Sequence, residues 1–219
     1  KAWDRNGVKS ISSSPTLTGT YDTPSNAIDV TLSADGNTAF VADNSTLQII
    51  DVSNPASPSL TASYDAPGLE KCLAISPDGN IAYIALRTGG IKALNISNLA
   101  SISTRNSHFD SQFYAEKVTI SPDGNTLFVI NNYPTAEKLA IFDITNGLTF
   151  KSNFAVDDAS GVVISPDGNT VAYFTDQAGY MDLILYNLDS GKQKKRLIRG
   201  NTTPDLEELK WLQPGLSWS

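Results

Sequence analysis

Ser121-Pro122-Asp123-Gly124-Asn125 is one of four similar five-residue stretches in this 219-residue chain, and the other three begin at Ser33, Ser76 and Ser165. In such a stretch Pro presets its φ angle, Asp bonds to nearby backbone and Gly adopts the left-handed conformation, so each one predicts a tight hairpin turn. Successive starts are separated by 43, 45 and 44 residues (76−33, 121−76 and 165−121). The spacing indicates an internal repeat of roughly 44 residues.

Strand-like segments surround each turn. Around Ser121, apolar or β-branched runs at 117–120 and 127–130 flank the turn, a third run covers 139–144, and a more polar segment follows at 148–156. Four strands in a unit of this length are typical of one blade of a β-propeller. No segment has a sustained helical period, so the predicted fold class is all-β with almost no helix.

The two ends of the chain fit into one further blade. Residues 7–11 align with 90–94 as a third strand, and 16–21 would be the fourth strand of that blade. Residues 209–212 resemble a first strand, and 216–219 would begin a second. A ring closed by strands from both ends leaves no open sheet edge. We therefore predict a single domain, 1–219, of about five four-stranded blades, with repeats starting near 27, 70, 115 and 159 and a last blade shared by 205–219 and 1–21. The alternative is a fragment of a larger ring.

Composition argues against two classes of partner. The net charge is −7 and the sequence pI about 4.6, so the overall field repels a nucleic-acid backbone. The basic run at 192–196 is interpreted as a solvated edge strand, since lysines discourage pairing between sheets. The longest apolar runs are only a few residues long, so no transmembrane helix is predicted.

Neither the single cysteine nor the single histidine predicts catalysis. Cys72 lies in the apolar segment 71–75 and is expected to be a core thiol, and His108 is expected at the outer rim of a blade as a surface residue. No nucleophile elbow, phosphate loop, zinc-protease motif or dinucleotide fingerprint occurs. The sequence therefore predicts no catalytic residue, no metal ligand and no cofactor.

The stretch from Ala39 to Gly68 closely resembles the LVIVD repeat, with Leu47-Gln48-Ile49-Ile50-Asp51-Val52 as its centre. Later units drift towards YVTN-type or Tol-associated propellers, as in the segment 185–191. The resemblance implies a propeller that is extracellular, periplasmic or on the cell surface. It supplies no catalytic residues, because the repeat motif contains none.

The two ends of the blades have different predicted roles. We call the end that carries the uniform Asp-Gly turns the turn side, and the end that carries the second-to-third and fourth-to-first loops the loop side. Loops on the loop side vary in length and content, as binding loops do, and first strands are expected to line the central channel. The predicted ligand-binding residues on the loop side are Glu70, Lys71, Glu116, Lys117, Tyr133, Asp157, Asp158, Asp176 and Tyr180.

Two further patterns have a structural and a functional interpretation. The carboxylates of that set, with Asp29, could hold a cation, but the neighbouring lysines favour an ion-paired rim. Aromatic or apolar residues followed by Asp recur near the end of each unit, which favours ring packing over sugar stacking. These pairs are Tyr21-Asp22, Tyr64-Asp65, Phe109-Asp110 and Val156-Asp157.

The predicted function is a non-catalytic binding or scaffold propeller, monomeric or part of a larger protein, that presents its loop side to a protein or carbohydrate ligand. One alternative is a metal-dependent, lactonase-like or hydrolase propeller with its site at the channel mouth, built from Glu70, Glu116, Asp157, Asp158 and Asp176. Another is a propeller module of a larger adhesin or sensor.

Overall fold

The computed structural model describes residues 16–68, 72–111, 113–133, 136–156, 159–177, 180–190 and 192–199, and for 136–137, 176–177, 180–181 and 192–199 it describes the backbone alone. Sixteen β-strands and no helix occur in these residues. The strands form four antiparallel sheets of four strands each. The prediction of an all-β chain is confirmed for the described residues.

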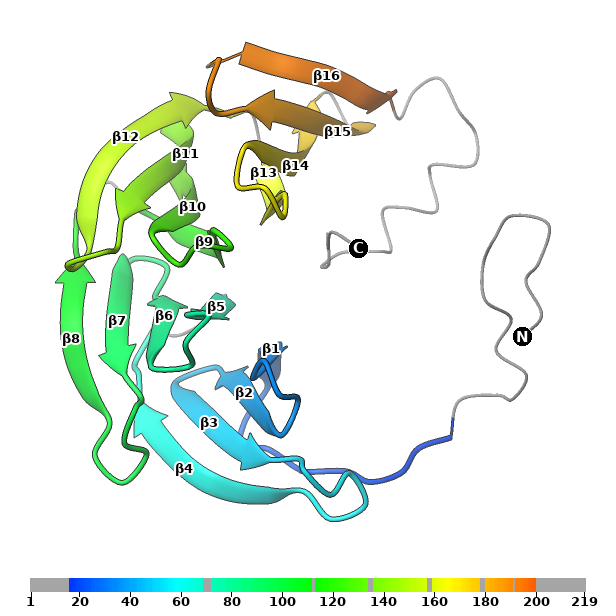
Figure 1. Ribbon diagram of the computed structural model, residues 1–219, viewed down its shortest axis with the longest axis vertical. Helices are drawn as coiled ribbons and strands as arrows, with labels where there is room; N and C mark the ends of the chain where they lie inside the picture. Colours follow the sequence, from blue (N-terminus) through cyan, green and yellow to red (C-terminus); the bar gives the residue numbers. More distant parts are fainter. Residues whose placement is uncertain are drawn as a thin grey trace.

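Each sheet is one blade, and its strands follow one another from the inside of the ring outwards (Figure 1). Blade one comprises β1 (Ala27–Leu32), β2 (Thr38–Asp43), β3 (Thr46–Asp51) and β4 (Ser59–Asp65). Blade two comprises β5 (Cys72–Ile75), β6 (Ile81–Ala85), β7 (Ile91–Asn95) and β8 (Ser103–His108). Blade three comprises β9 (Ala115–Ile120), β10 (Thr126–Tyr133), β11 (Ala136–Asp143) and β12 (Thr149–Ala155). Blade four comprises β13 (Ala159–Ile164), β14 (Thr170–Gln177), β15 (Tyr180–Asn187) and β16 (Lys192–Arg199).

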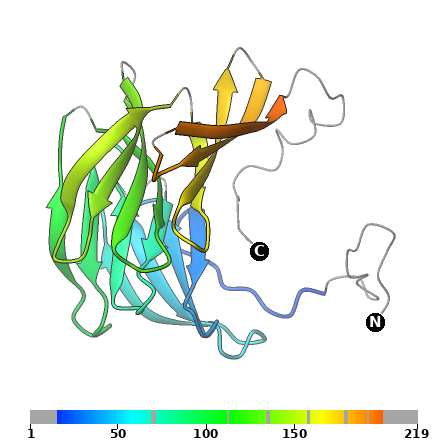
Figure 2. The ribbon, with the colours of Figure 1, turned by 45° about the horizontal axis from the view of Figure 1, so that its top comes forward.

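The blades lie side by side around a common axis, which is the arrangement of a β-propeller (Figures 1 and 2). Inner strands of successive blades contact each other, β1 with β5, β5 with β9 and β9 with β13. The predicted propeller is therefore confirmed, but the described residues form four blades and not about five. Most of the predicted fifth blade, namely 205–219 and 1–15, lies outside the described residues.

The repeated turn closes each β1–β2-type hairpin by the same hydrogen bonds. In blade three the Asp123 carboxylate accepts from the Ser121 hydroxyl and from the Asn125 backbone N–H at 3.0 Å. Ser121 Oγ also accepts from the Thr126 N–H at 2.9 Å, and Gly124 has a φ of 73°. Blades one, two and four repeat these contacts, which explains why the turns are uniform in sequence.

The hydrophobic core lies between the blades, in contacts that we call seams. At the seam between blades two and three, Tyr83 and Ile91 of one sheet pack in a single cluster with Val118, Leu127 and Phe142 of the next. The other seams are built alike. The sheets of blades two and three therefore pack against a neighbouring blade on both faces, as their largely apolar second and third strands require.

In blades one, two and three, an aromatic residue of the outer strand closes the seam to the following blade. Tyr64 pairs with Leu47, His108 with Ile91 and Phe154 with Leu139, so these three occupy one repeat position. The expected alignment of Phe109 and Val156 with Tyr64 is therefore wrong. Phe109 is 70% exposed beyond the strand, and Val156 is 4% exposed in a core cluster.

His108 lies on the outer strand β8, as the sequence predicted, but its side chain is half-buried and not exposed. Its ring lies 5.3 Å from that of Phe113 and 4.9 Å from that of Phe142, both in blade three or directly before it. Burial lowers the pKa of His108, against a smaller opposing effect of Asp110. His108 is therefore a seam residue, and its partly buried aromatic surroundings favour the neutral ring.

Blade one has an uncovered face. Val30 is 61% exposed and Leu32 is 56% exposed, whereas Leu73, Val118 and Val162, which occupy the position of Val30 in the other blades, are 4%, 6% and 8% exposed. In those blades the preceding blade covers this position. The described residues place no blade there on blade one.

The segment 16–21 does not form the predicted strand, since it has no ladder partner and its expected partner at 7–11 lies outside the described residues. It nevertheless runs along blade one. Tyr21 packs against Ala39, Val41 and Ile50. Tyr21 thus contacts blade one as Tyr64 contacts blade two.

Candidate functional site

First strands line a central cavity of about 380 Å³. Its walls include Asp29 of β1, Cys72 of β5, Lys117 of β9 and Gly161 of β13, which are equivalent positions of the four blades. The prediction that first strands face the channel is confirmed for these residues.

Two polar groups of the cavity wall, Asp29 and Cys72, have structural partners. Asp29 Oδ2 accepts from the Leu73 N–H at 2.9 Å and so ties blade one to blade two. Burial raises the pKa of Cys72 to about 12, and its thiol lies 3.7 Å from the Leu73 carbonyl oxygen and 3.8 Å from that of Val118. The thiolate is the reactive form of cysteine, so Cys72 is inert near neutral pH. Its predicted role as a core thiol is confirmed.

Of the nine predicted site residues, the structure describes Glu116, Lys117 and Tyr133 with their side chains, and Asp176 and Tyr180 by their backbone alone. Glu116 and Lys117 are neighbours in β9, where successive side chains point to opposite faces, and only Lys117 lines the cavity. Tyr133 ends β10 on the loop side. Asp176 and Tyr180 face Met181 and Gln177 across the backbone ladder of the β14–β15 hairpin. Glu70, Lys71, Asp157 and Asp158 lie outside the described residues.

No group of three metal-ligating side chains gathers among the residues that the structure describes. Glu116 is the only one of the five predicted channel-mouth carboxylates whose side chain is described. The ion-paired rim and the cation site therefore both stay predictions. Within the same residues, no helix has the length and apolar character needed to cross a membrane.

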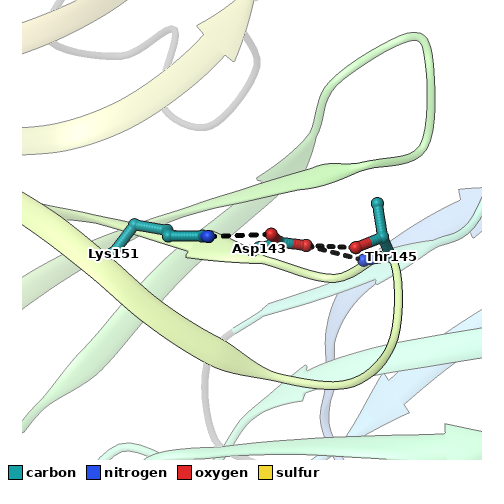
Figure 3. Close-up of polar contacts among 3 residues, drawn as sticks. All are labelled: Asp143, Thr145 and Lys151. Atoms are coloured by element: carbon teal, nitrogen blue, oxygen red, sulfur yellow. Dashed lines mark hydrogen bonds and ion pairs between the residues drawn. The ribbon is translucent and has the colours of Figure 1, made fainter.

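The recurring Asp or Asn at the end of each third strand is structural. Asp143 ends β11, and its carboxylate accepts from the Thr145 hydroxyl and N–H and lies 3.0 Å from Lys151 Nζ (Figure 3). These contacts, the Thr145 hydroxyl above all, lower the pKa of Asp143 to about 2. Asp51 and Asn95 cap the equivalent hairpins. The motif closes the β3–β4-type turn and provides no site.

The loop side carries a set of residues that the sequence did not single out as a group, which we call the Arg-Tyr-Tyr row. The Arg87 guanidinium carbon lies 5.7 Å from the centre of the Tyr114 ring, and the Tyr114 and Tyr133 rings are 5.9 Å apart at 62°. Arg87 is exposed and both tyrosines are half-buried. The row combines a cation with two partly open aromatic rings.

Three elements position the row. Arg87 belongs to the β6–β7 loop, Tyr114 directly precedes β9, and Tyr133 ends β10. The Tyr114 N–H donates to Asn131 Oδ1 at 2.7 Å, and the Asn132 N–H donates to the Tyr114 carbonyl at 3.0 Å. The backbone of Tyr114 is therefore fixed on both sides by the end of β10.

The β6–β7 loop holds Arg87 by its backbone. The Arg87 carbonyl accepts from the N–H groups of Gly90 and Ala115, each at 3.2 Å. Gly90 has a φ of 71°, and a Cβ atom there would lie 2.1 Å from the His108 carbonyl oxygen. Glycine is thus required at this close approach. The pair Gly89-Gly90 was the available sequence signal for an unusual loop.

The comparisons with known proteins agree with this fold. The LVIVD repeat family matches residues 26–66 and 73–108. Hydrazine synthase of Kuenenia stuttgartiensis superposes with a TM-score of 0.66 at 20% identity, over 83% of this chain and 52% of that one. A periplasmic gluconolactonase of Pseudomonas aeruginosa superposes with a TM-score of 0.62 at 20% identity, over 80% and 53%.

These structural likenesses show the fold alone. The chain spans about half the length of the solved structures that it matches. No curated protein matches it in sequence. The chain carries LVIVD repeats, arranged as blades of a β-propeller.

Proposed function

We propose that this chain is a non-catalytic binding propeller that presents its loop side to a protein or carbohydrate ligand. The observation that carries the proposal is the contrast between the two sides. On the turn side the Asp-Gly turns of the four described blades are closed by the same internal hydrogen bonds. On the loop side, Arg87, Tyr114 and Tyr133 form an exposed or half-buried row of residue types that blade one does not repeat at its equivalent positions.

The proposal is tested by one variant on each side. Wild type, Tyr133→Ala (loop side) and Pro77→Ala (turn side) are applied to a panel of immobilised glycans and peptides. Signals that weaken about tenfold in Tyr133→Ala and persist in Pro77→Ala support the proposal. Signals insensitive to Tyr133→Ala, or lost in Pro77→Ala, overturn it.

Export to the periplasm, the cell surface or the medium is part of the proposal. Its support is the resemblance to exported LVIVD-type propellers, together with the likeness to a periplasmic gluconolactonase. Fractionation of the source cells, with the protein detected by antibody, tests the location. Recovery in the cytoplasmic fraction alone contradicts it.

The second candidate function is a metal-dependent lactonase-like hydrolase. Its support is the fold likeness to the gluconolactonase and the predicted carboxylates Glu70, Glu116, Asp157, Asp158 and Asp176. Metal content of the purified protein and turnover of a sugar lactone, with and without chelator, separate the two candidates. Chelator-sensitive turnover with bound metal establishes the hydrolase, and its absence leaves the binding function.

We also propose that a fifth blade closes the ring, with its strands taken from 205–219 and 1–21. The uncovered Val30 and Leu32 and the seam-like packing of Tyr21 support a blade in this place. A module within a larger adhesin or sensor would use the same loop side. The unfolding comparison of Val30 and Val118 variants described in the Discussion tests closure.

A further inference from the structure

Arg87 occupies a backbone position that favours other residue types. Its φ is 47°, in the left-handed region, where Gly, Asn and Asp are tolerated best. The equivalent residue of blade one is Asn44, with a φ of 52°. The turn geometry alone therefore does not explain the choice of arginine.

The packing pattern of the repeat does not explain the two tyrosines of the row either. The seam aromatics Tyr64, His108 and Phe154 share one ladder position. Tyr114 lies outside that position, and its equivalent in blade one is Asn26, directly before β1. Tyr133 ends a strand two residues longer than β2 of blade one. Packing of the blades explains the seam aromatics but not these two rings.

The chemistry of the row fits an acidic sugar. An exposed guanidinium binds a carboxylate through paired hydrogen bonds. A partly open tyrosine ring offers an apolar face and a hydroxyl, which match the C–H and O–H faces of a pyranose. The Tyr114 and Tyr133 rings meet at 62°, so they form a corner beside the cation.

The row is also held in place before any ligand arrives. Hydrogen bonds from Ala115 to Arg87 and from Asn132 to Tyr114 join its backbone to β9 and β10. Binding then costs little conformational entropy in the loops, which favours affinity. We propose that the Arg-Tyr-Tyr row binds a uronate residue of an acidic glycan, an assignment that rests on the proposed binding function.

The test is calorimetric titration of the whole chain with tri-galacturonic acid and with its carboxyl-reduced trisaccharide. Arg87→Asn restores the residue that blade one uses at this φ, so the loop keeps its conformation. Arg105→Asn removes the same charge from the exposed outer strand β8 and is the matched control. Tyr133→Leu removes one ring.

We expect the acidic trisaccharide to bind, and its affinity to fall about tenfold or more in Arg87→Asn and in Tyr133→Leu but to stay unchanged in Arg105→Asn. The reduced trisaccharide should bind at least about tenfold more weakly to wild type. Melting curves of the three variants show whether each remains folded.

Equal binding of the two trisaccharides, or an unchanged affinity in Arg87→Asn, overturns the uronate site. The broader binding function then stands or falls by the separate panel experiment. Panel signals from peptides alone that weaken in Tyr133→Ala would overturn the acidic glycan and keep the loop-side function. Panel signals that do not change in Tyr133→Ala would overturn both the uronate site and the loop-side binding function.

Discussion

At the scale of single residues, protonation of His108 makes the stability of the seam between blades two and three depend on pH. Its ring stacks within 6.3 Å of Phe150 and contacts Phe113 and Phe142 edge to face. The folded state favours the neutral ring, because burial lowers its pKa from the usual 6.5. The unfolded chain therefore binds a proton more readily, so stability is complete above about pH 6.5 and decreases as the pH falls through that value towards the folded pKa.

The first prediction concerns this histidine. Wild type should melt at a lower temperature at pH 5 than at pH 7.5, and His108→Phe should flatten that difference because no proton can then be bound at the seam. Thermal unfolding by circular dichroism at several pH values measures it. The same slope in both proteins would show that His108 does not govern stability in this range.

The second prediction concerns the carboxyl group of Asp143. Its pKa of about 2 owes most to the Thr145 hydroxyl and less to Lys151, whose ion pair is exposed to solvent. Carbon-detected NMR titration should show a larger rise towards 3.8 in Thr145→Val than in Lys151→Met. The reverse order would mean that the ion pair holds the carboxylate ionised.

At the scale of elements, a few hydrogen bonds within the repeated turn stabilise each hairpin. Ser121 is buried, its oxygen accepts from the Thr126 N–H at 2.9 Å, and its hydroxyl donates to Asp123. Removing the hydroxyl leaves that N–H without this acceptor. Such a loss costs about 1 to 3 kcal/mol when the remaining group is buried.

The third prediction is that Ser121→Ala lowers the free energy of unfolding by about 1 kcal/mol, since the N–H is only partly buried. Ser152→Ala, in the exposed outer strand β12, is the control and should change it by less than about 0.5 kcal/mol. Urea denaturation measures both. Ser121→Ala should also weaken the acid dependence below pH 3.8, because the Ser121 hydroxyl is the main cause of the lowered pKa of Asp123. An effect no larger than the control would show that the turn tolerates the loss.

Sequence reasoning succeeded where the determinants are local. The turns follow from Pro, Asp and Gly within five residues, and the strand order follows from their spacing. It failed where a ladder decides the register, so that His108 and not Phe109 aligns with Tyr64. It also missed the Arg-Tyr-Tyr row, because Arg87, Tyr114 and Tyr133 are 27 and 19 residues apart in sequence (114−87 and 133−114) and meet only through tertiary packing.

At the scale of the whole molecule, blade one exposes the face that every other described blade buries. Val30 is 61% exposed and its counterpart Val118 is 6% exposed. A buried ionised carboxylate without a partner costs several kcal/mol, whereas one on an open surface costs little. The two valines therefore report whether a fifth blade covers blade one.

The fourth prediction is that Val30→Asp lowers the free energy of unfolding by about 3 kcal/mol, nearly as much as Val118→Asp, because the closing blade takes the place that blade two takes at Val118. Phe109→Asp, at a side chain that is 70% exposed and lies outside the proposed fifth blade, is the control and should change it by less than about 0.5 kcal/mol. Urea denaturation of the three variants over a range of protein concentrations measures the effect and detects association through the apolar face. If Val30→Asp behaves as Phe109→Asp does, nothing covers blade one and the five-blade ring is wrong. If Val30→Asp is costly only at high protein concentration, a second copy covers this face in place of a blade from the same chain, because only a contact between molecules depends on concentration.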